Sequence, residues 1–165
     1  MSTKNGTRNR GGLALFPVNI PEELKTRRQW MVWRYEVRDG DSTKVPYNAH
    51  TGLPASSTDL ETWAYFDAAL EAFENGGWDG VGFVFSSGDP YAGIDLDDVR
   101  DPATGEIAEH AQLVINAFDG AYIEVSPSGA GVHIITRAKV PKSLKRDWIE
   151  VYSQERYFTI TGVAL

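Results

Sequence analysis

Short segments with the two-residue alternation of β-strands dominate this sequence, and they limit what it can fold into more than any other feature. From Gln29 to Val37, for example, every second side chain is apolar or aromatic. Eight such segments, separated by turns rich in Gly, Pro, Asp and Ser, occupy residues 29–37, 44–47, 80–85, 91–97, 122–125, 132–137, 149–152 and 157–160. Their close spacing predicts that 80–85 and 91–97 pair as a hairpin, and that 122–125 and 132–137 flank a turn.

Two longer segments have the three-to-four-residue spacing of helices. Thr58 and Glu61 form a capping box ahead of the first one. The apolar residues of its predicted buried face are Trp63, Phe66, Ala69, Leu70 and Phe73. Residues 107–118 predict the second helix. The resulting order, β–β–α–β–β–α–β–β–β–β, predicts an α+β fold with helices packed on a largely antiparallel sheet.

The length of 165 residues suits one domain. We expect residues 1–12, which are polar and Gly-rich, to be a disordered tail, and residues 13–165 to form a single domain. No apolar run approaches the ~18–20 residues of a membrane span, and the N-terminal stretch lacks the apolar region of a signal peptide. The absence of cysteine excludes thiol chemistry and fits a reducing cytosol. We therefore expect a cytoplasmic protein with no membrane partner.

The net charge of −7 is unevenly distributed. Residues 59–124 carry fifteen acidic side chains and one basic side chain, whereas both flanks are mildly basic. A general DNA-coating protein would be basic throughout, although an enzyme can meet nucleic acid through bound metal ions and a local basic patch. Residues 137–146 form such a patch, which we expect to be a loop that contacts nucleic acid. Its basic residues are Arg137, Lys139, Lys142, Lys145 and Arg146.

Asp95 and Asp97 lie one residue apart on a predicted strand, so their side chains project from the same face, about 7 Å apart along the backbone. Two carboxylates in this arrangement can bind hard divalent cations, especially Mg²⁺, and they repel each other without one. The pair alone is a weak signal, because strand ends in water often carry such residues. A calcium EF-hand is excluded, because Val99 and Arg100 stand where that loop needs a ligand and a glycine.

A second cluster of candidate residues is the turn Ser126-Pro-Ser-Gly-Ala-Gly-Val-His133. Gly129 and Gly131 allow backbone N–H groups to approach an anion, Ser128 adds a hydroxyl, and His133 can contact the same phosphate. The turn is neither a Walker A loop nor a dinucleotide-binding fingerprint. Taken alone, it is more typical of a Gly-rich hairpin turn beside an exposed histidine.

Glu150 is a third candidate, because alternation turns its carboxylate away from Ile149 and Val151. It could complete a metal site with Asp95 and Asp97, or it could be an ordinary surface residue. Arg156 follows and is able to pair with a phosphate.

The three motifs in this order resemble the archaeo-eukaryotic primase superfamily, in particular the primase-polymerase domains of phage and plasmid replication proteins. The motifs are Gly93-Ile-Asp-Leu-Asp-Asp98, Ser126-Pro-Ser-Gly-Ala-Gly-Val-His133 and Ile149-Glu-Val-Tyr-Ser…Arg156-Tyr-Phe-Thr-Ile-Thr-Gly162, with Lys44-Val-Pro-Tyr47 upstream. The resemblance covers residues from about 29 to 165. It implies an RRM-like sheet with packed helices and a template-dependent DNA primase/polymerase that uses nucleoside triphosphates.

The resemblance also implies roles for individual residues. Asp95, Asp97 and Glu150 match the acidic ligands of a two-metal site for Mg²⁺ or Mn²⁺. His133, with Ser128, Gly129 and Gly131, matches the motif that holds the incoming triphosphate. Arg156 and Lys44 are proposed phosphate contacts. Single-stranded or primed DNA is the expected template, and a helical domain and a helicase are expected partners, since members usually continue into both.

Two other functions stay open from the residues themselves. A non-catalytic RRM-like nucleic-acid-binding module would have no need of three acids on one face. A metal-dependent nuclease could use the same acids, but it would need no triphosphate cradle at Ser128–His133.

Overall fold

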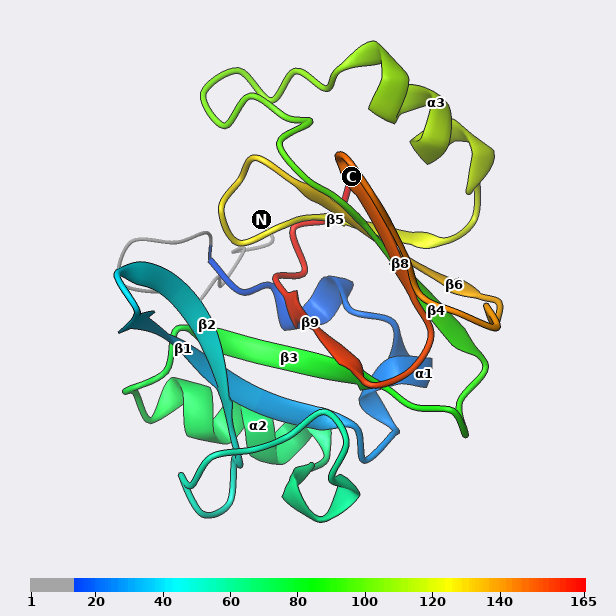
Figure 1. Ribbon diagram of the computed structural model, residues 1–165. Helices are drawn as coiled ribbons and strands as arrows, with labels where there is room; N and C mark the ends of the chain where they lie inside the picture. Colours follow the sequence, from blue (N-terminus) through cyan, green and yellow to red (C-terminus); the bar gives the residue numbers. More distant parts are fainter. Residues whose placement is uncertain (1–13) are drawn as a thin grey trace, which may run out of the picture.

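The strands of this chain form two antiparallel sheets where the sequence predicted one (Figure 1). The computed structural model describes residues 14–165, so the expected tail, residues 1–12, lies outside the described residues. Short helices pack on these sheets, and the predicted α+β class with largely antiparallel pairing is confirmed.

The first sheet has four strands: β1 (Trp30–Arg38), β2 (Asp41–Tyr47), β3 (Gly80–Phe85) and β9 (Arg156–Ile160), in the order β2-β1-β3-β9. The second sheet has five: β4 (Tyr91–Leu96), β5 (Tyr122–Val125), β6 (Val132–Arg137), β7 (Leu144–Arg146) and β8 (Ile149–Tyr152), in the order β5-β6-β4-β8-β7. The helical elements are η1 (Pro17–Asn19), α1 (Glu22–Lys25), η2 (Leu60–Thr62), α2 (Phe66–Glu74) and α3 (Glu109–Ala117).

The two longer helices cover different sheets, and Figure 1 shows them on opposite sides of the molecule. Helix α2 packs on the four-stranded sheet, where the Phe66 ring meets Trp30 edge-on at 4.8 Å. Helix α3 packs through Ala111 against Ile94 and Leu96 of the five-stranded sheet. Each helix therefore buries one apolar face, which is the main source of its stability.

The two sheets meet at a cluster of aromatic rings. Phe85 and Phe158 of the first sheet pack together at 4.9 Å, directly beside Gly93 of β4. A Cβ atom at position 93 would lie 2.5 Å from Phe158 and 2.6 Å from Phe85. Glycine at this position is what lets β4 approach the rings, and this approach brings the face that carries Asp95 close to β9.

The capping-box prediction is wrong, because α2 begins only at Phe66 and has no side-chain cap. Asp59 instead caps the short η2 turn, where its carboxylate accepts a hydrogen bond from the Glu61 N–H at 3.1 Å. Trp63 lies outside the helix and packs against Met31 and Val84 of the first sheet. The second helix is also shorter than predicted, at Glu109–Ala117.

The predicted hairpin of 80–85 with 91–97 is also wrong. Strand β3 pairs with β1 and β9, whereas β4 pairs with β6 and β8, so the turn between them is a corner between sheets. Asp89, 4% exposed, holds this corner by accepting hydrogen bonds from the backbone N–H groups of Ser86 and Tyr91, both at 2.7 Å. The β5–β6 pairing around the 126–131 turn is confirmed.

Candidate active site

A row of polar side chains crosses the five-stranded sheet from edge to edge. Asp95 in β4 lies directly opposite His133 in β6 on one side and Glu150 in β8 on the other. The row continues to Glu124 in β5, opposite His133, and to Lys145 in β7, opposite Glu150. Because directly paired residues of antiparallel strands share a face, five strands contribute one side chain each to the same surface.

This surface faces away from α3. Ile94 and Leu96, which alternate with Asp95, are buried in the cluster that α3 covers. Period-two alternation thus anchors β4 in the core through its apolar residues and turns the acid toward the other face. Two of the predicted acids, Asp95 and Glu150, lie side by side in this way.

Asp97 follows β4 and belongs to the same electrostatic environment. Burial, and then the negative charges of Asp95 and Glu150, raise the pKa of the Asp97 carboxyl above its ordinary value. The three predicted acids therefore repel one another. Across residues 14–165, the structure has no group of three or more Asp, Glu or His side chains arranged to hold a metal ion. The metal-binding role of these acids stays a prediction.

Glu150 is held by two hydrogen-bond donors. Lys145 and the Tyr152 hydroxyl both donate to its carboxylate. Burial opposes its ionisation, but these hydrogen bonds outweigh it, so that the pKa of Glu150 is lowered, with a further contribution from the charge of Arg156. Burial and the bond to Glu150 raise the pKa of Tyr152 to about 12, so this phenol stays a donor at neutral pH. Arg156 lies over the Tyr152 ring, 4.9 Å from its centroid.

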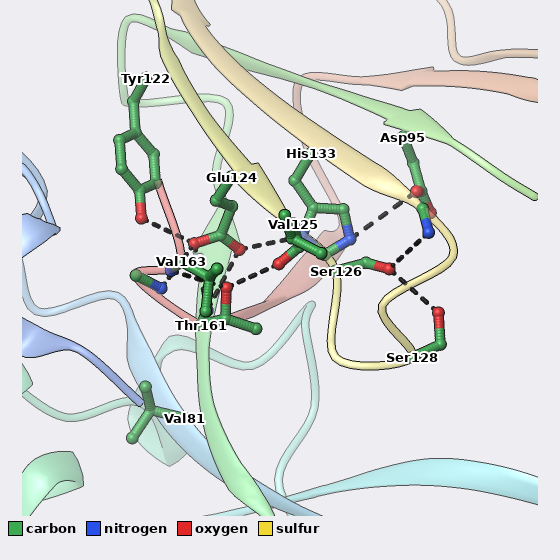
Figure 2. Close-up of polar contacts among 12 residues, drawn as sticks. Val81, Asp95, Tyr122, Glu124, Val125, Ser126, Ser128, His133, Thr161 and Val163 are labelled. Atoms are coloured by element: carbon green, nitrogen blue, oxygen red, sulfur yellow. Dashed lines mark hydrogen bonds and ion pairs between the residues drawn. The ribbon is translucent and has the colours of Figure 1, made fainter. Parts of the chain in front are cut away.

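His133 is buried, 3% exposed, and not the exposed histidine of the alternative interpretation. Figure 2 shows its ring between two carboxylates. Nδ1 lies 3.1 Å from Oε1 of Glu124, and Nε2 lies 3.7 Å from Oδ1 of Asp95. The ring also stacks on Phe158 of the other sheet, with centroids 4.8 Å apart. Nδ1 and one ring face are thus fixed by neighbours, and Nε2 is directed at Asp95.

Lys44 reaches this site from the first sheet. A cavity of about 220 Å³ is lined by Lys44, Asp95 and His133 together with Tyr157, Phe158 and Thr159 of β9. Burial lowers the pKa of Lys44, while the charges of Asp95 and Asp97 act in the opposite direction. A cation attracted to two acids from across a cavity is suited to contact an anionic ligand bound between them.

The Gly-rich turn packs against the end of β4. A Cβ atom at Gly131 would lie 2.9 Å from the carbonyl oxygen of Leu96, so this glycine is required by close packing. The N–H groups of Gly129 and Gly131 already donate within the turn, to the Ser126 carbonyl at 2.9 Å and the Ser126 hydroxyl at 3.1 Å. The hydroxyl of Ser128 lies 3.1 Å from that of Ser126. The turn therefore lies next to the row, and the N–H groups predicted to bind an anion donate to Ser126 within the turn.

The five predicted DNA-contacting residues do not form one loop, because β7 runs through the stretch. Arg137 pairs with Glu23, and Lys139 donates to the Ser86 carbonyl at 2.8 Å beside Asp89. Lys145 belongs to the polar row. The remaining two, Lys142 and Arg146, are exposed on the β7 side of the sheet.

Glu124 is the residue of this site that sequence reasoning missed. It lies in Tyr122-Ile-Glu-Val125, where strand alternation places its side chain on the face opposite to Ile123 and Val125. The same signal identified Glu150, so the pattern could have revealed Glu124 as an acid turned away from the apolar face.

No helix among residues 14–165 has the length and apolar character needed to cross a membrane.

No family model matches the chain. Over 146 residues, 84% of this chain, the sequence is 39% identical to the DNA primase-polymerase of Nitratiruptor phage NrS-1, and it spans 20% of the length of that protein. The chain is thus related by sequence to a phage DNA primase-polymerase, which agrees with the resemblance carried by its three motifs.

Proposed function

We propose that this chain is a template-dependent DNA primase/polymerase domain, which transfers nucleotides from nucleoside triphosphates in phage or plasmid replication. The observation that carries the proposal is the polar row across the five-stranded sheet, beside a cavity that Lys44 lines from the other sheet. The acids Asp95 and Glu150, with Lys145 beside them in the row and Lys44 across the cavity, suit a ligand that is itself anionic and arrives with divalent cations. The sequence relationship to a phage primase-polymerase supports the same function.

The three predicted acids fit a divalent-metal site by their chemistry. Asp95, Asp97 and Glu150 offer hard carboxylate oxygens, which Mg²⁺ and Mn²⁺ prefer. Burial and the neighbouring negative charges raise the pKa of Asp97, and a bound cation would relieve the repulsion among these charges. Two ions held there would supply Lewis-acid chemistry, activating a primer 3′-hydroxyl and balancing charge at the α-phosphorus.

The other residues would bind and orient the triphosphate. His133 would donate to a phosphate oxygen at the edge of the cavity, beside Ser128, Gly129 and Gly131. Lys44 and Arg156 would add positive charge near the phosphates, as guanidinium and ammonium groups commonly do. Holding the triphosphate in this way aligns the α-phosphorus for in-line attack by the 3′-hydroxyl, with pyrophosphate as the leaving group.

Partners follow from this chemistry. The substrates would be single-stranded or primed DNA and (deoxy)nucleoside triphosphates, and the DNA would be contacted by exposed basic residues such as Lys142 and Arg146. A helical domain and a helicase are proposed companions in replication, in the cytoplasm of the host cell.

Primer extension tests the proposal. The chain is incubated with a labelled primer on a DNA template, deoxynucleoside triphosphates and Mg²⁺ or Mn²⁺. We expect longer products from the wild type and a loss of at least about 100-fold in Asp95→Asn and Asp97→Asn, as when a group that stabilises transition-state charge is removed. Asp119→Asn, an exposed aspartate between α3 and β5, is the matched control and should retain activity.

The products also separate the alternatives. Shortened primers that depend on metal would indicate a nuclease. DNA binding with neither extension nor shortening of the primer, in Mg²⁺ or in Mn²⁺, would indicate a binding module and contradict the proposal.

A further inference from the structure

Glu124 is a buried acidic residue that the three motifs leave without a role. Its side chain is fully buried, 0% exposed, in β5 at the end of the polar row. Its carboxylate accepts from four donors: the Tyr122 hydroxyl at 2.7 Å, the backbone N–H groups of Thr161 and Gly162 at 3.1 and 2.8 Å, and Nδ1 of His133 at 3.1 Å. Figure 2 shows Tyr122, Thr161 and His133 converging on it.

The four contacts divide unequally between the two carboxylate oxygens. Tyr122 and Gly162 donate to Oε2, His133 faces Oε1, and the Thr161 N–H lies 3.1 Å from both. Because an ionised carboxylate can only accept, the contact with Nδ1 places a hydrogen on that nitrogen. The other nitrogen, Nε2, is then the one directed at Asp95 and the cavity.

We propose that Glu124 is a positioning residue, which acts through His133 by holding its ring with Nε2 directed at the bound triphosphate. This inference rests on the triphosphate role proposed for His133. Nε2 can reach a phosphate oxygen in the cavity only while the ring keeps this orientation. Glu124 accepts the hydrogen on Nδ1, and the stack on Phe158 fixes the plane of the ring.

A purely structural role for Glu124 is the competing explanation. Its contacts to Thr161 and Gly162 tie β5 to the segment that follows β9, and so they connect the two sheets. A substitution could therefore weaken function simply by loosening this connection. The experiment must show that the effect of Glu124 requires His133.

Glu124→Gln is the informative substitution. Oε2 has two donors of its own, so the amide oxygen is expected to take that position and the amide nitrogen to face Nδ1. Two donors would then oppose each other, and His133 must turn or lose the hydrogen on Nδ1. Tyr122→Phe is the matched control, because it removes a donor from Oε2 and leaves the Oε1 contact with His133 in place.

A double-mutant cycle measures the coupling. Affinity for a deoxynucleoside triphosphate with Mg²⁺ is determined for the wild type, Glu124→Gln, His133→Asn and the double variant. Asparagine can still donate to Glu124 but has no group in place of Nε2. We expect Glu124→Gln to weaken binding about tenfold in the wild-type background, the loss of one charge-assisted contact. In the His133→Asn background it should have less than a twofold effect, and Tyr122→Phe should bind as the wild type does.

Each outcome decides a different claim. An equal loss from Glu124→Gln in both backgrounds would overturn the positioning role and leave the proposed function intact. Unchanged affinity in His133→Asn would overturn the role of His133 and the inference with it. No Mg²⁺-dependent triphosphate binding by the wild type would overturn the proposed function itself.

If Glu124→Gln does not fold, nitrogen NMR of the His133 imidazole in the wild type still tests the inference. A hydrogen on Nδ1 that exchanges slowly with solvent supports the inference. An unprotonated Nδ1 in the folded protein overturns it.

Discussion

Asp95 meets a different partner on each flank, and this asymmetry distinguishes the two halves of the row. Toward β6 it faces His133, which is backed by the buried Glu124. Toward β8 it faces Glu150, which is backed by Lys145 and Tyr152. One half presents a ring nitrogen and the other presents a carboxylate. A triphosphate with its metal ions needs both kinds of group within reach.

Single residues of this site were predictable to the extent that alternation alone places them. Asp95 and Glu150 each alternate with apolar neighbours, so the sequence indicates that each side chain lies on the polar face of its own strand. The burial of His133 did not follow, because it depends on Phe158, a residue 25 positions away in the other sheet. Sequence patterns describe one strand at a time, and this contact joins two sheets.

The raised pKa of Asp97 gives a prediction for stability without metal. A carboxyl with a raised pKa binds its proton more tightly in the folded state than in the unfolded state. Stability therefore falls as the pH rises above the ordinary value of 3.8, and it does not recover at neutral pH. Asp97→Asn removes this cost. We expect its Tm in a chelator at pH 7 to be roughly 1–3 °C higher than that of the wild type, because the exposed charge is partly screened.

The gain should shrink as the pH approaches 4, where the wild-type carboxyl becomes protonated. Thermal unfolding at pH 7 and near pH 4 measures this gain in Tm, with Asp119→Asn for comparison. A lower Tm for Asp97→Asn at pH 7 would show that the acids do not repel one another in the folded protein.

Elements were predicted better than their pairings. Most strand positions followed from alternation, whereas the turn Ser86–Pro90 suggested a hairpin that the protein does not form. The buried Asp89 explains why, since its carboxylate accepts from Gln29 at 2.8 Å as well as from the turn itself, and it lies 3.4 Å from Lys139. These partners lie 60 and 50 residues away, beyond what a local turn pattern can indicate.

Asp89→Ala tests whether this corner holds the two sheets together. The substitution leaves buried donors without an acceptor, so we expect a loss of about 3 kcal/mol and a Tm roughly 6–12 °C lower. Asp101 is the matched control, because it also accepts from a turn, at the Ala103 N–H, but is exposed. Asp101→Ala should cost less than about 1 kcal/mol. Equal losses in the two variants would contradict a special role for the Asp89 corner.

Strand β7 gives a prediction about DNA. The basic residues in and before this strand were expected in a loop. Lys145 forms an ion pair with Glu150, whereas Lys142 and Arg146 are exposed. If both contact phosphates, replacing both with Ala should weaken binding to single-stranded DNA. The slope of log affinity against log salt should also flatten by roughly 1.4, about 0.7 for each lost contact. Arg28→Ala, before β1, should leave the slope unchanged. An unchanged slope in the double variant would make these residues ordinary solvated surface.

At the scale of the whole molecule, the proposed function depends on the junction of the two sheets. The five-stranded sheet supplies the acids and His133, the four-stranded sheet supplies Lys44 and the Phe158 ring, and Gly93 lets them approach. The sequence predicted the α+β class. It did not predict two sheets, because the number of sheets depends on which strands pair across the whole chain.

The central claim is that this junction binds a nucleoside triphosphate together with divalent cations. The most direct measurement is the titration of the wild-type chain with a deoxynucleoside triphosphate, in Mg²⁺ and in a chelator, beside Asp95→Asn. It requires no template and no other domain. We expect measurable affinity in Mg²⁺, with a loss of at least about tenfold in the chelator and in Asp95→Asn, because the phosphate charge would then lack its cations. Equal affinity with and without Mg²⁺, or no affinity for any triphosphate, would contradict the account.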